Sequence, residues 1–164
     1  MQTSNSAFDP LRRARVGAAV LAIGGALTFS SPQPALAALG GPDASVAMDH
    51  AVLRGTLSVT PMQAFDVHRI AGDGGQTVRE YATRQGRIFA VTWHGPRSPD
   101  LKLLLGAYFD RYVAAAKLQR TGHHLLSIRT PELVMTVVRF QRSASGQAYV
   151  PALMPRGVTR AELR

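Results

Sequence analysis

The residues best suited to bind a ligand are one arginine and several aromatic side chains between positions 65 and 94. Arg79, Tyr81, Phe89 and Trp93 are expected to share one face of an antiparallel sheet, because alternate residues of a strand point the same way. Aromatic rings around a guanidinium suit a polysaccharide, a peptide or an anionic ligand. This hypothesis requires the helix of the domain to cover the opposite face, and the sequence leaves open which face it covers.

Trp93 and His94 stand directly before a Gly-Pro break, and two interpretations apply to them. In the first, the break is the junction between a strand and a helix, and Trp93 anchors the core beneath that helix. In the second, the indole stacks on a ligand and the imidazole hydrogen-bonds to it, near backbone N–H groups of a helix start that attract anions. The sequence favours the junction, and His94 stays a candidate binding residue.

The sequence lacks the common catalytic patterns. It has no Gly-x-Ser-x-Gly nucleophile elbow, no His-Glu-x-x-His and no pair of histidines four residues apart. Asp66 and Glu80 could lie opposite each other as in a glycosidase, although two exposed acids near arginines explain them more simply. The adjacent His123 and His124 would point to opposite faces of a strand. We therefore predict no metal site or cofactor, and a site near His94 or His68 is the alternative if the protein is an enzyme.

Three β-rich runs separated by turn-rich connections predict an antiparallel meander. The runs are FDVHRI, QTVREYAT and RIFAVTW, and AGDGG and RQG connect them. If each hairpin is symmetric about its loop, Phe65 pairs with Tyr81, Tyr81 with Phe89, and Thr77 with Trp93. One face then contains Phe65, Val67, Arg79, Tyr81, Phe89, Val91 and Trp93. The other face contains Asp66, His68, Ile70, Val78, Glu80, Ile88 and Ala90. A slip of one residue would exchange the faces.

One long helix, roughly Pro99 to Lys117, follows the meander. Ser98 suits the N-cap position, and Pro99 suits the first helical position. Apolar residues then recur with helical spacing at Leu101, Leu104, Leu105, Tyr108 and Tyr112. The helix should therefore pack on one face of the sheet. Before the meander, SVAMDHAVLRG forms either a short helix or irregular structure.

The β pattern returns after the helix. LLSIRT and ELVMTVVRFQR read as two strands, and QAYV reads as a short edge strand ended by Pro151. Thr159 and Glu162 have the spacing of a capping box, which predicts a last short helix. Three strands, a helix and two or three further strands predict an α+β fold with an antiparallel sheet.

The first 37 residues read as a cleavable secretory signal peptide. A basic segment ending at Arg15 precedes an apolar run, and Ala35-Leu36-Ala37 fits a peptidase site. Residues 38–164 then form a single domain that is exported to the periplasm or secreted. An uncleaved anchor and twin-arginine export are the alternatives. The chain has a formal charge of +9 and no Cys, so disulfides, thiol catalysis and thiolate metal sites are excluded.

Three segments together resemble a known family. They are the ALGG near position 40, the block REYATRQGRIFAVTWHGPRSPDLKLLLGAYFDRY, and the late GQAYVPALMPRGV. From Leu39 to Val158 the chain resembles an exported proteobacterial family catalogued as domain of unknown function 2844. The resemblance implies a signal peptide and one compact domain, and it implies no activity, ligand or functional residue.

These observations favour a non-catalytic binding or interaction module for an anionic envelope component or another envelope protein. Outside the cytoplasm, a basic domain would meet anionic lipid, lipopolysaccharide or acidic polysaccharide rather than nucleic acid. A small periplasmic enzyme, hydrolase-like, is the alternative. A third hypothesis is assembly with another chain through a free strand edge at QAYV or FDVHRI. After signal cleavage, the protein is not expected to be an integral membrane protein.

Overall fold

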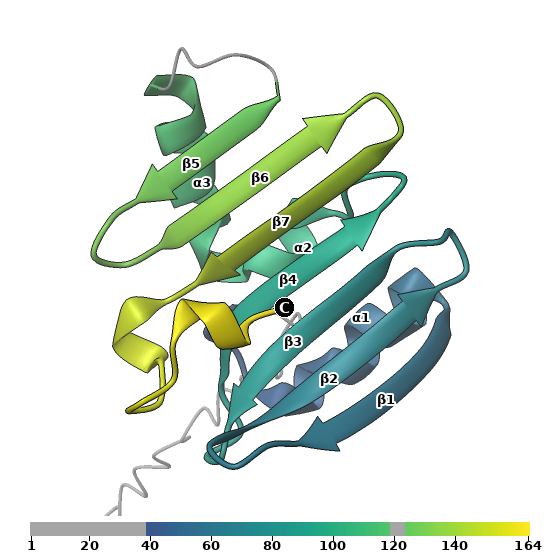
Figure 1. The fold of residues 1–164 in the computed structure, drawn as a ribbon, viewed down its shortest axis with the longest axis vertical. Helices are drawn as coiled ribbons and strands as arrows, with labels where there is room; N and C mark the ends of the chain where they lie inside the picture. The colour runs from purple at the N-terminus through teal and green to yellow at the C-terminus, as the bar shows by residue number, and fades with distance from the viewer. Residues whose placement is uncertain (1–38, 119–123) are drawn as a thin grey trace, which may run out of the picture. The chain divides into compact units, whose positions relative to one another are not determined.

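The computed structural model describes residues 39–118 and 124–164, which form a seven-stranded antiparallel sheet with helices on one face (Figure 1). The strands are β1 (Gly55–Pro61), β2 (Phe65–Gly72), β3 (Thr77–Thr83), β4 (Ile88–Gly95), β5 (Leu125–Arg129), β6 (Val134–Phe140) and β7 (Ser143–Tyr149). The α+β class is therefore confirmed. The expected signal peptide lies outside the described residues. Within them, no helix is long and apolar enough to cross a membrane.

The sheet consists of two meanders joined side by side. The strand order is β1-β2-β3-β4-β7-β6-β5, so the chain leaves β4, crosses to the far edge and returns to pair β7 with β4. The expectation that QAYV forms an edge strand is wrong, because it belongs to the central strand β7. FDVHRI is not an edge strand either, because it lies in β2 and β1 pairs with the outer side of β2. Sequence reasoning missed β1, an edge strand whose residues GTLSVTP are mostly exposed.

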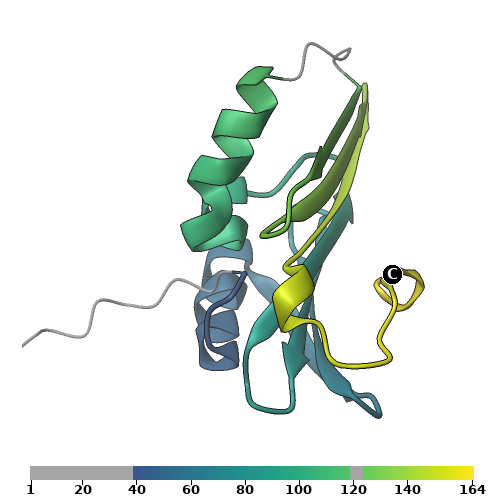
Figure 2. The same cartoon turned by 90° about the vertical axis from the view of Figure 1, so that its left-hand side faces the viewer.

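The helices lie on one face of the sheet, and the C-terminal segment lies on the other (Figure 2). They are α1 (Val46–Leu53), α2 (Leu101–Leu105) and α3 (Phe109–Leu118), with the 3-10 turn Gly106–Tyr108 between α2 and α3. The expected single helix is thus broken. Gly106 adopts a positive φ of 47°, a conformation that glycine tolerates and that ends α2. The expected N-cap is also wrong, because Asp100 accepts hydrogen bonds from the backbone N–H groups of Lys102 and Leu103 at 2.8 and 3.3 Å.

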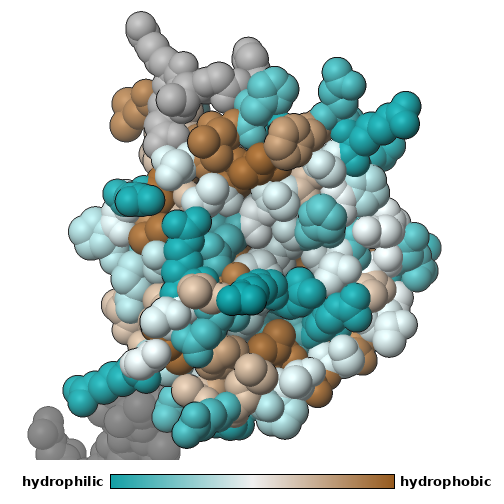
Figure 3. Space-filling model, in the orientation of Figure 1, coloured by the Kyte–Doolittle hydropathy of each residue, from teal (hydrophilic) through white to brown (hydrophobic). Residues whose placement is uncertain are grey.

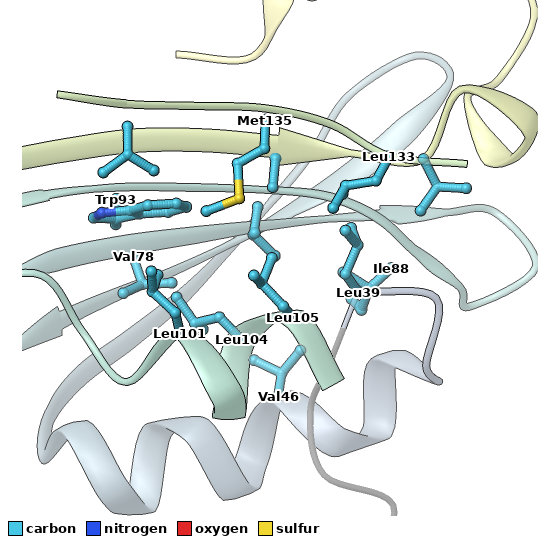
Figure 4. Close-up of a cluster of buried hydrophobic side chains, with 14 of the residues drawn as sticks. Leu39, Val46, Val78, Ile88, Trp93, Leu101, Leu104, Leu105, Leu133 and Met135 are labelled. Atoms are coloured by element: carbon cyan, nitrogen blue, oxygen red, sulfur yellow. The ribbon is translucent and has the colours of Figure 1, made fainter. Parts of the chain in front are cut away.

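The main core lies between the sheet and the helices. Trp93 and Met135 from the sheet pack with Leu101, Leu104 and Leu105 of α2 (Figure 4). Gly146 stands opposite Trp93 in the next strand, and a Cβ there would overlap the indole ring. Trp93 is therefore a core anchor beneath the helix, as the junction interpretation predicts.

A β-bulge in β4 moves Trp93 to this face. The strands β3 and β4 pair Val78 with Trp93 and Tyr81 with Ala90, and the register shifts between Tyr81 and Ala82. The expected pairing of Tyr81 with Phe89 and of Thr77 with Trp93 is therefore wrong by one residue beyond the bulge. Because of this extra residue, Val91 and Trp93 face the helices instead of sharing a face with Tyr81.

The register between β2 and β3 differs from expectation without changing the faces. Phe65 pairs with Thr83, and Val67 pairs with Tyr81. The expected pairing of Phe65 with Tyr81 is wrong by two residues, and a shift of two keeps each side chain on its own face.

A smaller aromatic core lies on the face opposite the helices. Phe65, Tyr81 and Phe89 pack with ring centroids 5.7 to 6.2 Å apart, and Leu163 of the C-terminal segment packs against them. The segment ends in the 3-10 turn Arg160–Glu162 with the predicted capping box, in which the backbone N–H of Thr159 donates to Glu162 Oε2 at 2.6 Å. The C-terminal segment thus covers part of this face and leaves the rest open.

Candidate functional site: an arginine-rich hollow

A hollow of about 290 Å³ lies on the open part of the sheet, beside the C-terminal segment. Strands β3, β4, β7 and β6 form its floor, and the C-terminal segment forms one wall. Its lining residues are Arg79, Thr92, Trp93, His94, Thr136, Val138, Ser145, Gly146, Gln147, Arg160, Leu163 and Arg164.

The floor of the hollow is part of a row of polar residues that crosses the sheet. Arg79 pairs with Thr92, Thr92 with Gln147, and Gln147 with Thr136. Residues directly opposite each other on neighbouring strands point to the same face, so these four side chains lie side by side. The row continues beyond Arg79 to Arg69, which pairs with it on β2.

Hydrogen bonds fasten the C-terminal wall to this floor. Arg160 Nε donates to Gln147 Oε1 at 2.9 Å, and Gln147 Nε2 donates to the carbonyl of Leu163 at 3.1 Å. The hydroxyl of Tyr81 donates to the carbonyl of Arg164 at 2.8 Å. Burial raises the pKa of Tyr81, despite opposing effects of Thr92 and Arg79, so the hydroxyl stays protonated and can donate this bond.

The charged side chains that line the hollow are arginines. Its lining includes Arg79, Arg160 and Arg164 but no Asp or Glu. Within the two described ranges the one ion pair joins Arg84 to Asp66, outside the hollow. Arg69 and Arg79 stand directly opposite each other, an arrangement of like charges that is unfavourable by itself. An anion placed between these guanidinium groups would relieve that repulsion and accept charge-assisted hydrogen bonds.

Three of the five predicted binding residues, Arg79, Trp93 and His94, line the hollow. Tyr81 and Phe89 are on the same face but are buried in the aromatic core, where no ligand can stack on them. Trp93 borders the hollow, while its indole packs in the core on the helix side. The expected cluster of exposed aromatics around Arg79 is therefore wrong.

Sequence reasoning missed the residues that complete the hollow. Gln147 was assigned to an edge strand, and Thr136 lay on a strand of unknown position. The only pattern near Arg160 and Arg164 is the capping box of Thr159 and Glu162. It predicts a helical turn but does not predict where that turn packs on the sheet. The pairing of β7 with both β4 and β6 is what assembles these residues, and no local pattern encodes it.

A second cluster of ionisable residues lies on the helix side. Asp49 of α1 and Glu80 of β3 are completely buried, at 0 % and 1 % exposure. In the part of the chain that the structure describes, no N–H or hydroxyl donor reaches either carboxyl, and a proton shared between the two acids gives each of them one hydrogen bond. Burial raises the pKa of Glu80 to about 9, with a further increase from Asp49, and burial raises the pKa of Asp49 to about 6.

The remaining predicted acids and histidines do not form a site. Asp66 pairs with Ala82, and Glu80 pairs with His68, so the expected alignment of Asp66 with Glu80 is wrong. His68 lies on the helix side, away from His94 in the hollow. Across residues 39–118 and 124–164, no three His, Asp or Glu residues are placed to hold a metal ion. His123 lies outside the described residues.

Comparison with known proteins gives a family and no activity. A family model described as "Protein of unknown function (DUF2844)" matches residues 35–163, in agreement with the resemblance seen in the sequence. Neither a curated protein nor a solved structure matches the chain.

Proposed function

The chain belongs to the DUF2844 family of proteins of unknown function, and we propose that its domain is a non-catalytic module that binds anionic groups in the arginine-rich hollow. The observation that supports this most is the set of arginines around the hollow with no carboxylate side chain in its lining. Arginines that serve only to stabilise a fold are normally paired with carboxylate side chains.

The hollow has room for one or a few anionic groups of a larger ligand. The polar row extends from the hollow to Arg69, so a chain of anionic groups could follow it across β4, β3 and β2. Carboxylates of an acidic polysaccharide and phosphates of an envelope component share this chemistry. The proposal includes export of the domain, and N-terminal sequencing of the protein from cells would begin at Ala38 if the leader is removed as the sequence indicates.

Arg79→Gln in the full chain tests the proposal by isothermal titration calorimetry. The probes are oligogalacturonate, for carboxylates, and inorganic pyrophosphate, for phosphates, with a neutral maltooligosaccharide as the negative control. Arg79 forms no ion pair within residues 39–118 and 124–164, so its loss should weaken binding of the anionic probe about tenfold. Added salt should weaken binding by the wild type as well.

Arg111→Gln is the matched control, because it makes the same charge change in α3, across the sheet from the hollow. Equal losses in the two variants would show a general charge effect and no site at the hollow. If neither anionic probe binds the wild type, the proposal is wrong and a protein partner takes its place.

A further inference from the structure

A second feature of the structure is independent of the hollow: an exposed apolar patch beside the β6–β7 turn. Phe140 is 67 % exposed at the end of β6, and Leu125 is 53 % exposed at the start of β5. Leu125 pairs with Val138, and Phe140 lies two residues further along the same face. Figure 3 shows apolar side chains gathered over this end of β5 and β6.

Cationic side chains flank the patch, and acids are absent from it. Arg139 and Arg142 are exposed on either side of Phe140 and Gln141. Both segments of the patch, 124–125 and 138–143, contain no Asp or Glu. A hollow beside the turn is lined by His124, Phe140, Gln141, Arg142 and Ser143. An apolar tip next to positive charge therefore occurs at one end of the sheet.

We propose that this β6–β7 tip, consisting of Phe140, Leu125, Arg139 and Arg142, docks the protein on the surface of a bilayer that contains anionic lipid. Phe140 and Leu125 enter the boundary between head groups and acyl chains, where apolar side chains are stabilised. The two arginines remain at the level of the head groups and attract phosphate, and the hollow beside Phe140 receives one head group. The positive formal charge of the chain acts in the same direction.

A lipid surface fits this tip better than a folded partner does. Phe140 is 67 % exposed at the end of a hairpin, so a folded partner would need a pocket that matches its ring. A bilayer needs none, because it deforms around one inserted ring. The remaining sheet edge, β1, also exposes Val59, but its seven residues include no charged side chain. Of these two exposed apolar sites, the β6–β7 tip is therefore the one that combines apolar side chains with positive charge.

Phe140→Trp in the full chain provides a direct test. Wild-type protein has one Trp, Trp93, which is 2 % exposed in the core and should report no contact with lipid. The vesicles are phosphatidylcholine with or without phosphatidylglycerol, and their acyl chains are brominated to quench nearby tryptophan. We expect the fluorescence of the Phe140→Trp variant to be quenched by the anionic vesicles and to remain unchanged with pure phosphatidylcholine.

Val59→Trp is the matched control, because Val59 has a similar exposure of 53 % and lies at the opposite edge of the sheet. Its fluorescence should not change. The proposal is overturned if Phe140→Trp is not quenched, if both variants are quenched equally, or if neutral vesicles quench as strongly as anionic ones. The site-specific readout separates the tip from any contribution of the apolar N-terminal run.

Vesicle co-sedimentation supplies a second measurement without an introduced Trp. Phe140→Ser should lower partition onto anionic vesicles about tenfold, and Arg142→Gln should lower it about fivefold. Arg111→Gln, which makes the same charge change in α3, should leave it nearly unchanged, which distinguishes docking at the tip from a general charge effect. Unchanged partition in Phe140→Ser would contradict the proposal.

Discussion

At the residue scale, the buried pair of Asp49 and Glu80 makes stability depend on pH. The pKa of Glu80 is raised by burial from 4.5 to about 9 in the folded protein. A raised pKa means that the folded state holds its proton more tightly than the unfolded state does. The resulting stabilisation is complete below pH 4.5 and is lost as the pH rises toward about 9, because ionising Glu80 places a second negative charge beside Asp49.

Glu80→Gln should therefore remove most of this pH dependence. Glutamine keeps the shape of the protonated acid, and its amide can donate to Asp49 at every pH. We expect the free energy of unfolding of the wild type to fall between pH 6 and about 9 and that of the variant to fall much less. Urea unfolding at a series of pH values measures the difference. Glu132→Gln, in the exposed β5–β6 turn, should behave like the wild type, and parallel curves for wild type and Glu80→Gln would refute the account.

At the element scale, the start of α2 shows how a local pattern can predict a helix and miss its first residue. Ser98 and Asp100 are both common N-cap residues, and sequence preference alone does not separate them. In the structure, Asp100 bonds to two backbone N–H groups, whereas Ser98 Oγ is buried without a partner among the described residues. The folded path of the chain before the helix decides between them.

The two alternatives can be separated by substitution. Asp100→Ala should lower the free energy of unfolding by about 1 kcal/mol, because the amides of Lys102 and Leu103 lose their acceptor. Ser98→Ala should change stability by less than about 0.5 kcal/mol, since no bond of that hydroxyl is lost. Thermal or urea unfolding of the two variants measures this contrast. A larger loss in Ser98→Ala than in Asp100→Ala would restore Ser98 as the cap.

The same scale shows which parts of the fold can be predicted from the sequence. The strands β2, β3 and β4, the apolar stripe of the helix and the capping box depend on neighbours within a few residues, and the sequence predicts them, although it misses β1 and the register of the hairpins. The bulge near Phe89 and the central position of β7 depend on pairing between distant segments. A one-residue bulge was enough to move Trp93 from the predicted binding face into the core.

At the scale of the whole molecule, the helices cover one face of the sheet and the C-terminal segment covers part of the other. This arrangement leaves Arg79 accessible, as the binding hypothesis required, and buries Tyr81 and Phe89, which the hypothesis had counted as ligand contacts. Of the residues that line the hollow, the sequence therefore predicts Arg79, Trp93 and His94 as binding residues. Gln147, Thr136 and Arg160 join them through strand pairing and chain reversal that composition and periodicity do not encode.

The central claim is that the polar row on the open face, and not the helical face, receives an anionic ligand. Mapping backbone amide chemical shifts by NMR during titration with oligogalacturonate or pyrophosphate tests it most directly. The account predicts the largest changes at Arg79, Thr92 and Gln147, with residues of α1 and α3 unaffected. Changes centred on the helices, or spread evenly over exposed arginines, would contradict it.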